Sequence, residues 1–388
     1  MHRPPAPHGA SAPFLHRLFR VAALAALMLP WTGPGLLTAP PAAASGVVEQ
    51  QTDKLKDSGS AARFGFRSGS FILAPIPFKS PLIGSGLALG GAYLFRNDAE
   101  SDTSNIALGA FRTSNGSTGF GLLGKLAFSD NRWQSQMFVG RAELNYDVFT
   151  PLGPVPIRQR GDLFSLKLAY GFTPDFSIGP TLRYLDSGIA PAAGLLPPQI
   201  APDINLKLVT LGLALDWDTR DDSDYPTRGA RATLEALGGR SVNGFRRDYA
   251  MAYANYDAFV SLSRSTVLAS RVSVCGASAS APFFEKCAPG LNDNFRGFPA
   301  TQYLDRRSAS VQFEIRQRLG RRFGAVAFAG LGQAGPSFGA LDRNGTLGAA
   351  GVGARFRLSR EFPVDFSVDM SWNSNDDRLT YIYVGQRW

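Results

Sequence analysis

The sequence is poor in histidine, cysteine and charged residues. Its three histidines, His2, His8 and His16, all lie close to the N-terminus of a chain of 388 residues. Charged residues make up 18% of the chain, against roughly 25% in an ordinary soluble domain. The one long apolar run covers residues 21–29. A spanning helix needs about 20 apolar residues, so the composition argues against a helical membrane protein.

The N-terminus has the features of a secretory signal peptide. Arg17 and Arg20 precede the apolar run, and three consecutive alanines further on offer a cleavage site. We therefore predict a signal peptide over residues 1–44 and a short polar periplasmic tail over residues 45–62. The alternative is an N-terminal membrane anchor, and Pro30 argues against it because it interrupts the apolar stretch.

Cleavage after residue 44 removes every histidine from the chain. A Ser-His-Asp triad, a Cys-His pair and a histidine-ligated metal are then excluded, because each needs an imidazole. We expect neither enzymatic activity nor a cofactor, although this count leaves chemistry that uses only carboxylates or a Ser-Lys pair open. After cleavage 37 basic and 31 acidic residues remain, and this excess of +6 is modest and scattered, so we expect no nucleic-acid partner.

The chain has two cysteines, Cys275 and Cys287, which are 12 positions apart. Exported proteins keep disulfides because their compartment is oxidising. The pair is therefore predicted to form a disulfide that closes a short loop. Two free thiols are the alternative.

A strict alternation of apolar and polar side chains runs through the rest of the chain. It is clearest in residues 138–148, 164–172, 209–218, 308–316 and 364–373. Such alternation indicates strands with one apolar and one polar face. After residue 60 the sequence shows no helical period over the length of an ordinary helix. The pattern predicts an all-β protein.

Alternating segments of about ten residues, separated by turn residues, are typical of a transmembrane β-barrel. Only a closed barrel lets strands span a bilayer, because every backbone group is then paired. We predict a single outer-membrane barrel domain over residues 63–388, antiparallel and with about 16 strands. The alternative is a soluble β-sandwich or propeller. The clustering of tyrosine and tryptophan near segment ends, as in an interfacial girdle, argues against it.

The connections between the predicted strands alternate in length. Those after even-numbered strands are mostly short, whereas those after odd-numbered strands include 150–162, 187–203 and 276–307. Outer-membrane barrels have short periplasmic turns and longer extracellular loops, so both termini are predicted to lie in the periplasm. The expected strands are 63–73, 85–96, 105–114, 118–128, 133–149, 163–172, 175–186, 204–218, 229–238, 248–262, 266–275, 308–319, 324–333, 347–358, 363–373 and 380–388.

Two motifs stand in the second half of the chain. One is a D-x-R-D…P-T-x-G turn after the eighth predicted strand, carried by Asp218, Arg220, Asp221, Pro226 and Gly229. The other, Arg296-Gly297-Phe298, lies in the longest predicted loop. Together they resemble the BamA/TamA outer-membrane assembly superfamily, the bacterial surface antigen family, over residues 203–388. The segment 75–87 also looks like the start of members that lack periplasmic POTRA domains. The last segment, ending in Trp388, resembles the aromatic-ended C-terminal strand of outer-membrane proteins.

The resemblance implies that the sixth extracellular loop folds into the barrel lumen and that Arg296 pairs there with acidic residues of the wall. Glu314 lies on the polar face of its strand and is the expected inward partner. Gly297 allows a tight backbone at the tip, and Phe298 is expected to anchor the loop by packing. The alternative is that Arg296 is an ordinary solvated loop residue.

The sequence departs from the family pattern at Gly330. Members carry an aspartate there, in an F-x-D-x-G segment. The resemblance therefore predicts that one of two acidic partners of Arg296 is missing and that the lid is held more weakly. A disulfide between Cys275 and Cys287 would compensate by fixing the loop covalently.

The resemblance also implies a location in the outer membrane of a Gram-negative bacterium and a role in outer-membrane biogenesis or in translocation of protein or lipid. Relatives receive clients through periplasmic domains, which this chain is expected to lack, so that function does not carry over whole. The alternative is a passive pore or structural protein without a client. The expected partners are outer-membrane lipids, a protein or lipid client, and a second copy of the chain.

Overall fold

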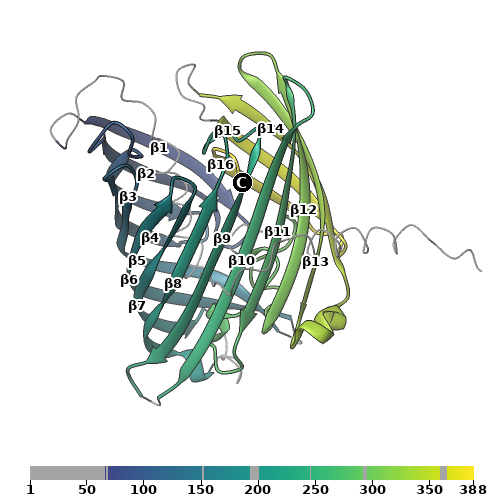
Figure 1. Cartoon of the computed structure of the whole chain (residues 1–388). Helices are drawn as coiled ribbons and strands as arrows, with labels where there is room; N and C mark the ends of the chain where they lie inside the picture. Colours follow the sequence, from purple (N-terminus) through teal and green to yellow (C-terminus); the bar gives the residue numbers. More distant parts are fainter. Residues whose placement is uncertain are drawn as a thin grey trace, which may run out of the picture. The chain divides into compact units, whose positions relative to one another are not determined.

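The computed structural model describes residues 66, 69–150, 153–192, 201–244, 246–291, 295–358 and 365–388. The predicted signal peptide and polar tail lie outside the described residues. The described chain forms a closed barrel of sixteen strands in which each strand is antiparallel to its neighbours (Figure 1). This confirms the predicted fold class. No helix in the described part of the chain is long and apolar enough to cross a membrane.

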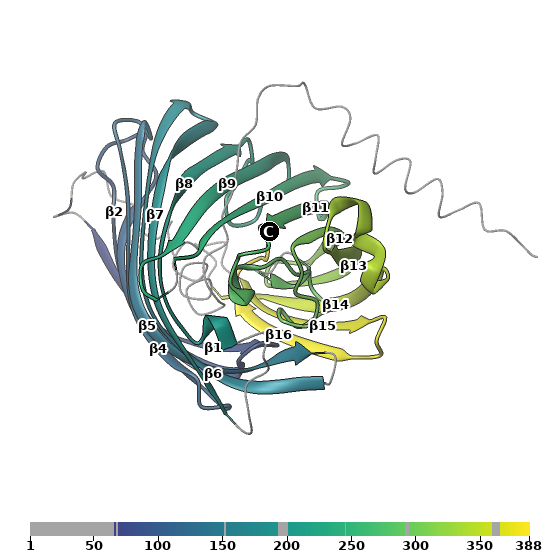
Figure 2. The same cartoon turned by 90° about the horizontal axis from the view of Figure 1, so that it is seen from below.

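The strands follow one another around the barrel in chain order, as the ring in Figure 2 shows. They are β1 (Ser70–Ser80), β2 (Gly84–Phe95), β3 (Ser104–Thr113), β4 (Thr118–Phe128), β5 (Trp133–Thr150), β6 (Gly153–Thr173), β7 (Phe176–Pro191), β8 (Asn205–Asp218), β9 (Gly229–Ser241), β10 (Asp248–Ser261), β11 (Thr266–Ala277), β12 (Arg307–Leu319), β13 (Phe323–Gly335), β14 (Leu347–Arg357), β15 (Asp365–Asn373) and β16 (Arg378–Val384). The loops carry the 3-10 helices η2 (Ala201–Asp203), η3 (Phe283–Glu285) and η5 (Phe338–Asn344).

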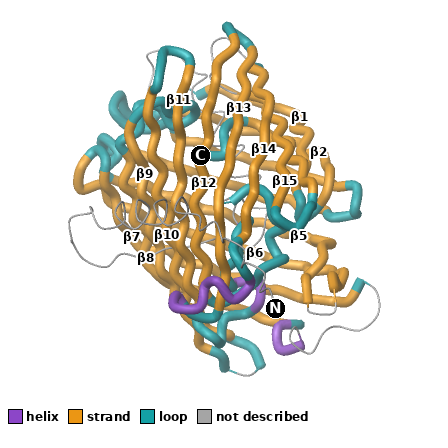
Figure 3. Tube along the Cα trace, turned by 90° about the vertical axis from the view of Figure 1, so that its right-hand side faces the viewer, coloured by secondary structure: helices purple, strands orange, loops and turns teal. Residues whose placement is uncertain are grey.

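The two ends of the barrel differ in the length of their connections. Short turns such as 174–175 and 320–322 join strands at one end, called here the turn end. The connections 192–204, 278–306 and 336–346 lie at the opposite end, called here the loop end. Figure 3 shows the strands along the wall, with loops gathered at its two ends. The segment 278–306 between β11 and β12 is called the lid loop below.

The first described strand ends further along the chain than predicted. The alternation predicted a strand at 63–73, of which residues 63–65, 67 and 68 lie outside the described residues. The structure instead carries β1 through Pro75 and Pro77, and its pairing with β2 is continuous across both. A proline fits an edge strand when its nitrogen faces away from the ladder. Within the described residues one register pair joins the other side of β1 to β16, so β1 accepts both prolines.

The hairpin of β5 and β6 is longer than predicted. Segment 150–162 was expected to be a loop, but β5 and β6 remain paired from Trp133↔Tyr170 to Thr150↔Gly153. Inward and outward positions continue to alternate up to the tip of the hairpin. The alternation there is real, although Pro154 and Pro156 mask it in the sequence.

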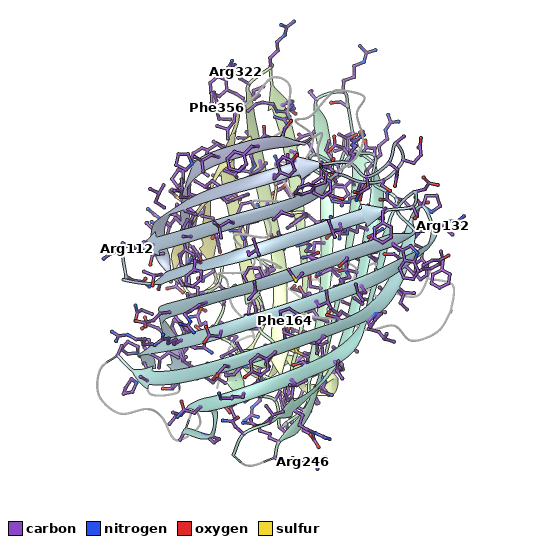
Figure 4. All side chains as sticks on the ribbon, turned by 90° about the vertical axis from the view of Figure 1, so that its left-hand side faces the viewer. Arg112, Arg132, Phe164, Arg246, Arg322 and Phe356 are labelled. Carbon is purple, nitrogen blue, oxygen red and sulfur yellow. A yellow bond between two sulfur atoms is a disulfide. The ribbon has the colours of Figure 1, made fainter. Side chains whose placement is uncertain are left out.

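The two faces of the wall have different chemistry. The outer face exposes large apolar side chains on most strands, including Leu108, Phe120 and Phe313. In Figure 4, Phe164 lies in the middle of the outer surface, whereas labelled arginines such as Arg112 and Arg246 lie at its margins. An apolar outer band with charged margins fits a wall that contacts lipid.

The inner face of β5 is apolar at the loop end. Leu144, Tyr146 and Val148 are buried inside the barrel, and Phe283 of the lid loop belongs to the same packed cluster. The opposite side chains include Arg141, which pairs with Asp162 on the outer surface. The lid loop therefore supplies an apolar partner inside the barrel, where a water-filled lumen would favour polar residues.

Candidate functional site

The lid loop begins and ends at a tightly bonded base. Cys275, near the end of β11, forms a disulfide with Cys287 in the loop. Cys287 also exchanges two backbone hydrogen bonds of 2.9 Å with Asp305, just before β12. The disulfide and this bridge hold the middle of the lid loop against the loop ends of β11 and β12.

Arg296 lies at the centre of the inner wall and is fully buried. Its guanidinium pairs with Glu314 of β12, with 2.6 Å between Nη2 and Oε2, and with Asp369 of β15, with 2.8 Å between Nη1 and Oδ2. Nε donates a third contact to Oε1 of Gln312 at 3.1 Å. The ring of Phe328 lies 3.7 Å from the guanidinium carbon. The lid loop thus reaches two wall strands, β12 and β15, through one side chain.

The surroundings of Arg296 keep it charged. Burial alone would lower the pKa of Arg296, but the carboxylates of Glu314 and Asp369 raise it above its ordinary value. A buried charge is tolerated only when it is paired and hydrogen-bonded, and removing one partner of such a pair costs about 3–5 kcal/mol. Release of the loop therefore requires the separation of buried opposite charges.

The residues after Arg296 close the tip against the wall. Gly297 has a φ of 131°, in the region that favours glycine, and a Cβ there would lie 2.2 Å from that of Ala349. Its N–H donates to the Tyr381 hydroxyl, and its carbonyl accepts from Asn373, each at 2.8 Å. Phe298 is buried and stacks on Phe295. The close approach to Ala349 thus requires a glycine at position 297, and Phe298 fixes the tip by packing on Phe295.

Arg296 has two acidic partners, contrary to the prediction that one would be missing. The second carboxylate comes from Asp369 on β15. Gly330 on β13 could not carry it without rearrangement, because a Cβ there would lie 2.4 Å from the Val311 carbonyl oxygen and 2.8 Å from the Phe295 ring. The prediction of a more weakly held lid, which rested on one missing partner, therefore loses its basis.

Further arginines share the same two carboxylates. Arg355 of β14 donates to Asp369 at 2.5 Å, and Arg316 of β12 donates to Glu314 at 2.7 Å. The Tyr383 hydroxyl donates to Asp369 at 2.7 Å. The site is therefore a connected network of charge-assisted hydrogen bonds, which are shorter and stronger than neutral ones.

The turn motif lies elsewhere, at the turn end between β8 and β9. Asp218 accepts two hydrogen bonds from the Arg220 guanidinium, at 2.8 and 2.6 Å. Asp221 accepts the N–H of Thr227 at 2.8 Å and the N–H of Arg228 at 3.1 Å. These bonds fix the shape of the turn.

Two further residues of the motif complete the turn. Pro226 is buried, and Gly229 has a φ of 90°. A Cβ on Gly229 would lie 2.2 Å from the Thr219 carbonyl oxygen. The roles of Pro226 and Gly229 in this structure are conformational.

A chain of contacts joins the turn motif to the lid network. The Tyr225 ring lies 3.9 Å from the guanidinium carbon of Arg318 and 5.8 Å from that of Arg316. Arg316 in turn donates to Glu314, the partner of Arg296. The structure therefore keeps the two motifs apart but joins them through arginines of β12.

The predicted last strand, 380–388, is wrong at its end. β16 stops at Val384, and Gly385 turns the chain with a φ of 92°. Trp388 is buried on the inner wall against Phe259, Val267 and Ala269. Its ring lies 5.3 Å from the guanidinium carbon of Arg296. The aromatic residue is therefore part of the lumen packing and does not face outward.

Sequence reasoning missed several residues of this site. Asp369 had a signal, because it stands in a run of alternate polar residues on β15 that the structure turns inward. Arg355 and Tyr383 had no comparable signal, since their roles depend on which strands face each other. Their partners come from other strands of the closed barrel.

The fold and the site define a class of protein, a closed β-barrel whose long loop places an arginine between carboxylates of the inner wall. Particular solved structures share this fold. The chain is similar to BamA from Haemophilus ducreyi lacking POTRA domains 1–3, with 12% identity, a TM-score of 0.56, and coverage of 81% of this chain and 70% of that one.

It is also similar to CdiB from Acinetobacter baumannii, with 11% identity, a TM-score of 0.55, and coverage of 81% of this chain and 59% of that one. For CdiB from Escherichia coli the identity is 12% and the TM-score 0.53, with coverage of 82% of this chain and 67% of that one. The chain thus spans less than two thirds of the length of the Acinetobacter CdiB chain. No protein-family model and no curated protein sequence matches it. At identities this low, the structural similarity shows a shared fold alone.

Proposed function

We propose that the protein is a bacterial outer-membrane barrel that assists envelope biogenesis by opening its wall between β1 and β16. In this proposal the turn end faces the periplasm and a protein or lipid client moves sideways between the lumen and the bilayer. The apolar outer band and the likeness of the fold to BamA and CdiB support the location.

The pairing of β1 with β16 is the observation that carries the proposal. One register pair, Lys79↔Ile382, joins these two strands. By contrast, β12 and β13 pair continuously from Arg307↔Gly335 to Leu319↔Phe323. Strand pairing supplies the hydrogen bonds that a bilayer cannot, so this junction is the weakest place in the wall.

The sequence of β1 and the end of β16 explain the weak junction. Pro75 and Pro77 cannot donate hydrogen bonds, and because their pairing with β2 is unbroken, we place the missing donors on the side of β16. Gly385 turns the chain inward directly after β16, so no strand continues beside the first part of β1 in the described structure. Both features keep this seam short.

The lid favours lateral movement over free passage along the barrel axis. Arg296 and its two carboxylates are buried at the inner wall, and the lid loop packs against residues of several strands. A passive pore, the second candidate, would need this network to separate in its resting state. Since a buried pair is costly to break, the seam is the easier place to open.

The test is to lock the seam with a reversible covalent bond. Cys275→Ser/Cys287→Ser provides a background without native cysteines, and Lys79→Cys/Ile382→Cys places a cross-strand pair on the outer face of the seam. The control pair, Val311→Cys/Leu331→Cys, lies on the outer face of the fully paired β12–β13 ladder. Each variant is purified and reconstituted in vesicles.

Two probes then report activity in the vesicles. They are the folding rate of a small urea-unfolded outer-membrane barrel and the movement of a fluorescent phospholipid between leaflets. We expect the oxidised seam variant to lose acceleration of at least one probe, the control to retain it, and a reductant to restore it. A locked seam that leaves both activities intact would refute the proposal. A protein that accelerates neither probe but conducts ions continuously would support the passive pore.

A further inference from the structure

The lid loop has a second attachment, on the wall opposite the one that holds Arg296. Glu285 of η3 accepts two hydrogen bonds from Nη2 of Arg183 on β7, at 2.6 and 2.7 Å. Both side chains are almost completely buried. The partners are 102 positions apart in the chain, so closure of the barrel brings them together.

Neighbouring loops reinforce this attachment. Asp203 of η2 accepts the N–H of Phe283 at 2.8 Å and pairs with Arg247 from the β9–β10 connection. Arg247 also donates to the carbonyl oxygens of Ser280 and Ala281. The first half of the lid loop is therefore tied to β7 and to two other loops of the loop end.

Apolar packing supports the same half of the loop. Phe283 is buried in a cluster with side chains of β1, β3 and β5, including Ile76, Phe111 and Tyr146. Phe284 packs against this cluster and against the one that contains Tyr249. None of the direct partners of Arg296 belongs to this cluster, although Leu304, later in the lid loop, also packs against it.

A fixed point at Cys287 divides the lid loop into two segments. The disulfide and the Cys287–Asp305 bridge fix the middle of the loop to β11 and β12. Residues 278–286, the front segment, precede this fixed point, and residues 295–304, the tip segment, follow it. Cys287 therefore anchors the backbone between the two segments.

We infer that the lid consists of two independently released segments, each held by its own buried ion-pair latch. The front latch is Arg183–Glu285, and the tip latch is Arg296 with Glu314 and Asp369. Arg183 and Glu285 are positioning residues that hold the front segment across the lumen. This goes beyond seam opening, because it concerns closure of the lumen and holds whether or not the seam opens.

The test uses the full-length protein in planar bilayers with the disulfide intact. Glu285→Gln weakens the front latch, Asp369→Asn weakens the tip latch, and a third variant carries both changes. We expect each single variant to show its own class of opening events at about 30 times the wild-type frequency, the effect of losing one charge-assisted hydrogen bond. The double variant should show both classes, each at its single-variant frequency.

Two further variants separate latch release from damage to the barrel. Arg183→Glu/Glu285→Arg reverses the front pair and should restore closure. Asp248→Asn breaks the exposed Arg240–Asp248 pair and should leave conductance unchanged. Heat-modified gel mobility checks that every variant forms the barrel.

Three results would overturn the inference. They are an unchanged conductance in Glu285→Gln, a single class of events shared by both single variants, or openings that occur only in the double variant. The last two would mean that the loop moves as one rigid lid.

Discussion

Asp369 is the residue whose replacement tests the account of the lid most directly. It comes from β15 and supplies the second carboxylate that was predicted to be missing because residue 330 is a glycine. Asp369→Asn keeps the size of the side chain and removes its charge. Arg296 would then retain Glu314 as its only carboxylate within the network described here.

The magnitude follows from the contacts that are lost. A hydrogen bond to a charged group contributes about 1.5–3 kcal/mol, and complete loss of a buried partner costs about 3–5 kcal/mol. Arg296 loses one of two carboxylates, so about 2 kcal/mol is the expected loss in tip docking. At 1.4 kcal/mol for each factor of ten, the undocked population rises about 30-fold.

Single-channel recording measures this population as the fraction of time spent open. Asp365→Asn is the matched control, since Asp365 lies on the inner face of the same strand and pairs with Arg318 and Arg357, away from Arg296. We expect Asp369→Asn to open the channel and Asp365→Asn to leave it closed. Equal opening in both variants, or none in Asp369→Asn, would refute the reasoning. Adding Gly330→Asp to Asp369→Asn should not restore closure, because the added Cβ meets the Val311 carbonyl.

Three other changes have defined outcomes. Reduction, or Cys287→Ser, should raise conductance by freeing the middle of the lid loop, and a conductance that stays the same would count against the disulfide as a restraint. Gly297→Ala should raise the open probability because its Cβ overlaps that of Ala349. Adding Ala349→Gly should recover part of the closure. A Gly297→Ala variant that stays fully closed would contradict this. Asp221→Ala should lower the temperature of the heat-modified gel shift, with a loss of about 1–3 kcal/mol. Asp221→Asn should lose less because its side-chain oxygen still accepts, so equal losses would argue against hydrogen bonding as the cause.

The sequence predicted the strands well where alternation was unbroken. β8 and β12 lie close to their expected positions because every second residue is apolar over 209–217 and over 309–315. The predicted end of the first strand at residue 73 and the predicted loop at 150–162 were wrong, and prolines lie in both segments. Proline lacks the backbone N–H donor. Whether a strand tolerates it depends on whether a neighbouring strand lies on the side of the proline nitrogen.

The candidate site was predictable in part. The Arg296 motif, Glu314 and the cysteine pair could be named from the sequence, and the structure places Arg296 beside Glu314 and joins Cys275 to Cys287. Asp369 could not be chosen as a partner in advance. Its contact with Arg296 spans 73 positions and exists because closure of the barrel faces the loop toward β15.

The sequence by itself determined the class of fold, because the two-residue period depends only on which side chains share a face of a strand. Closure of the barrel decided the rest. It placed Glu285 against Arg183, turned Trp388 into the lumen, and left β1 and β16 with a single register pair. These features depend on distances between strands far apart in the chain, and no local pattern of residues records such distances.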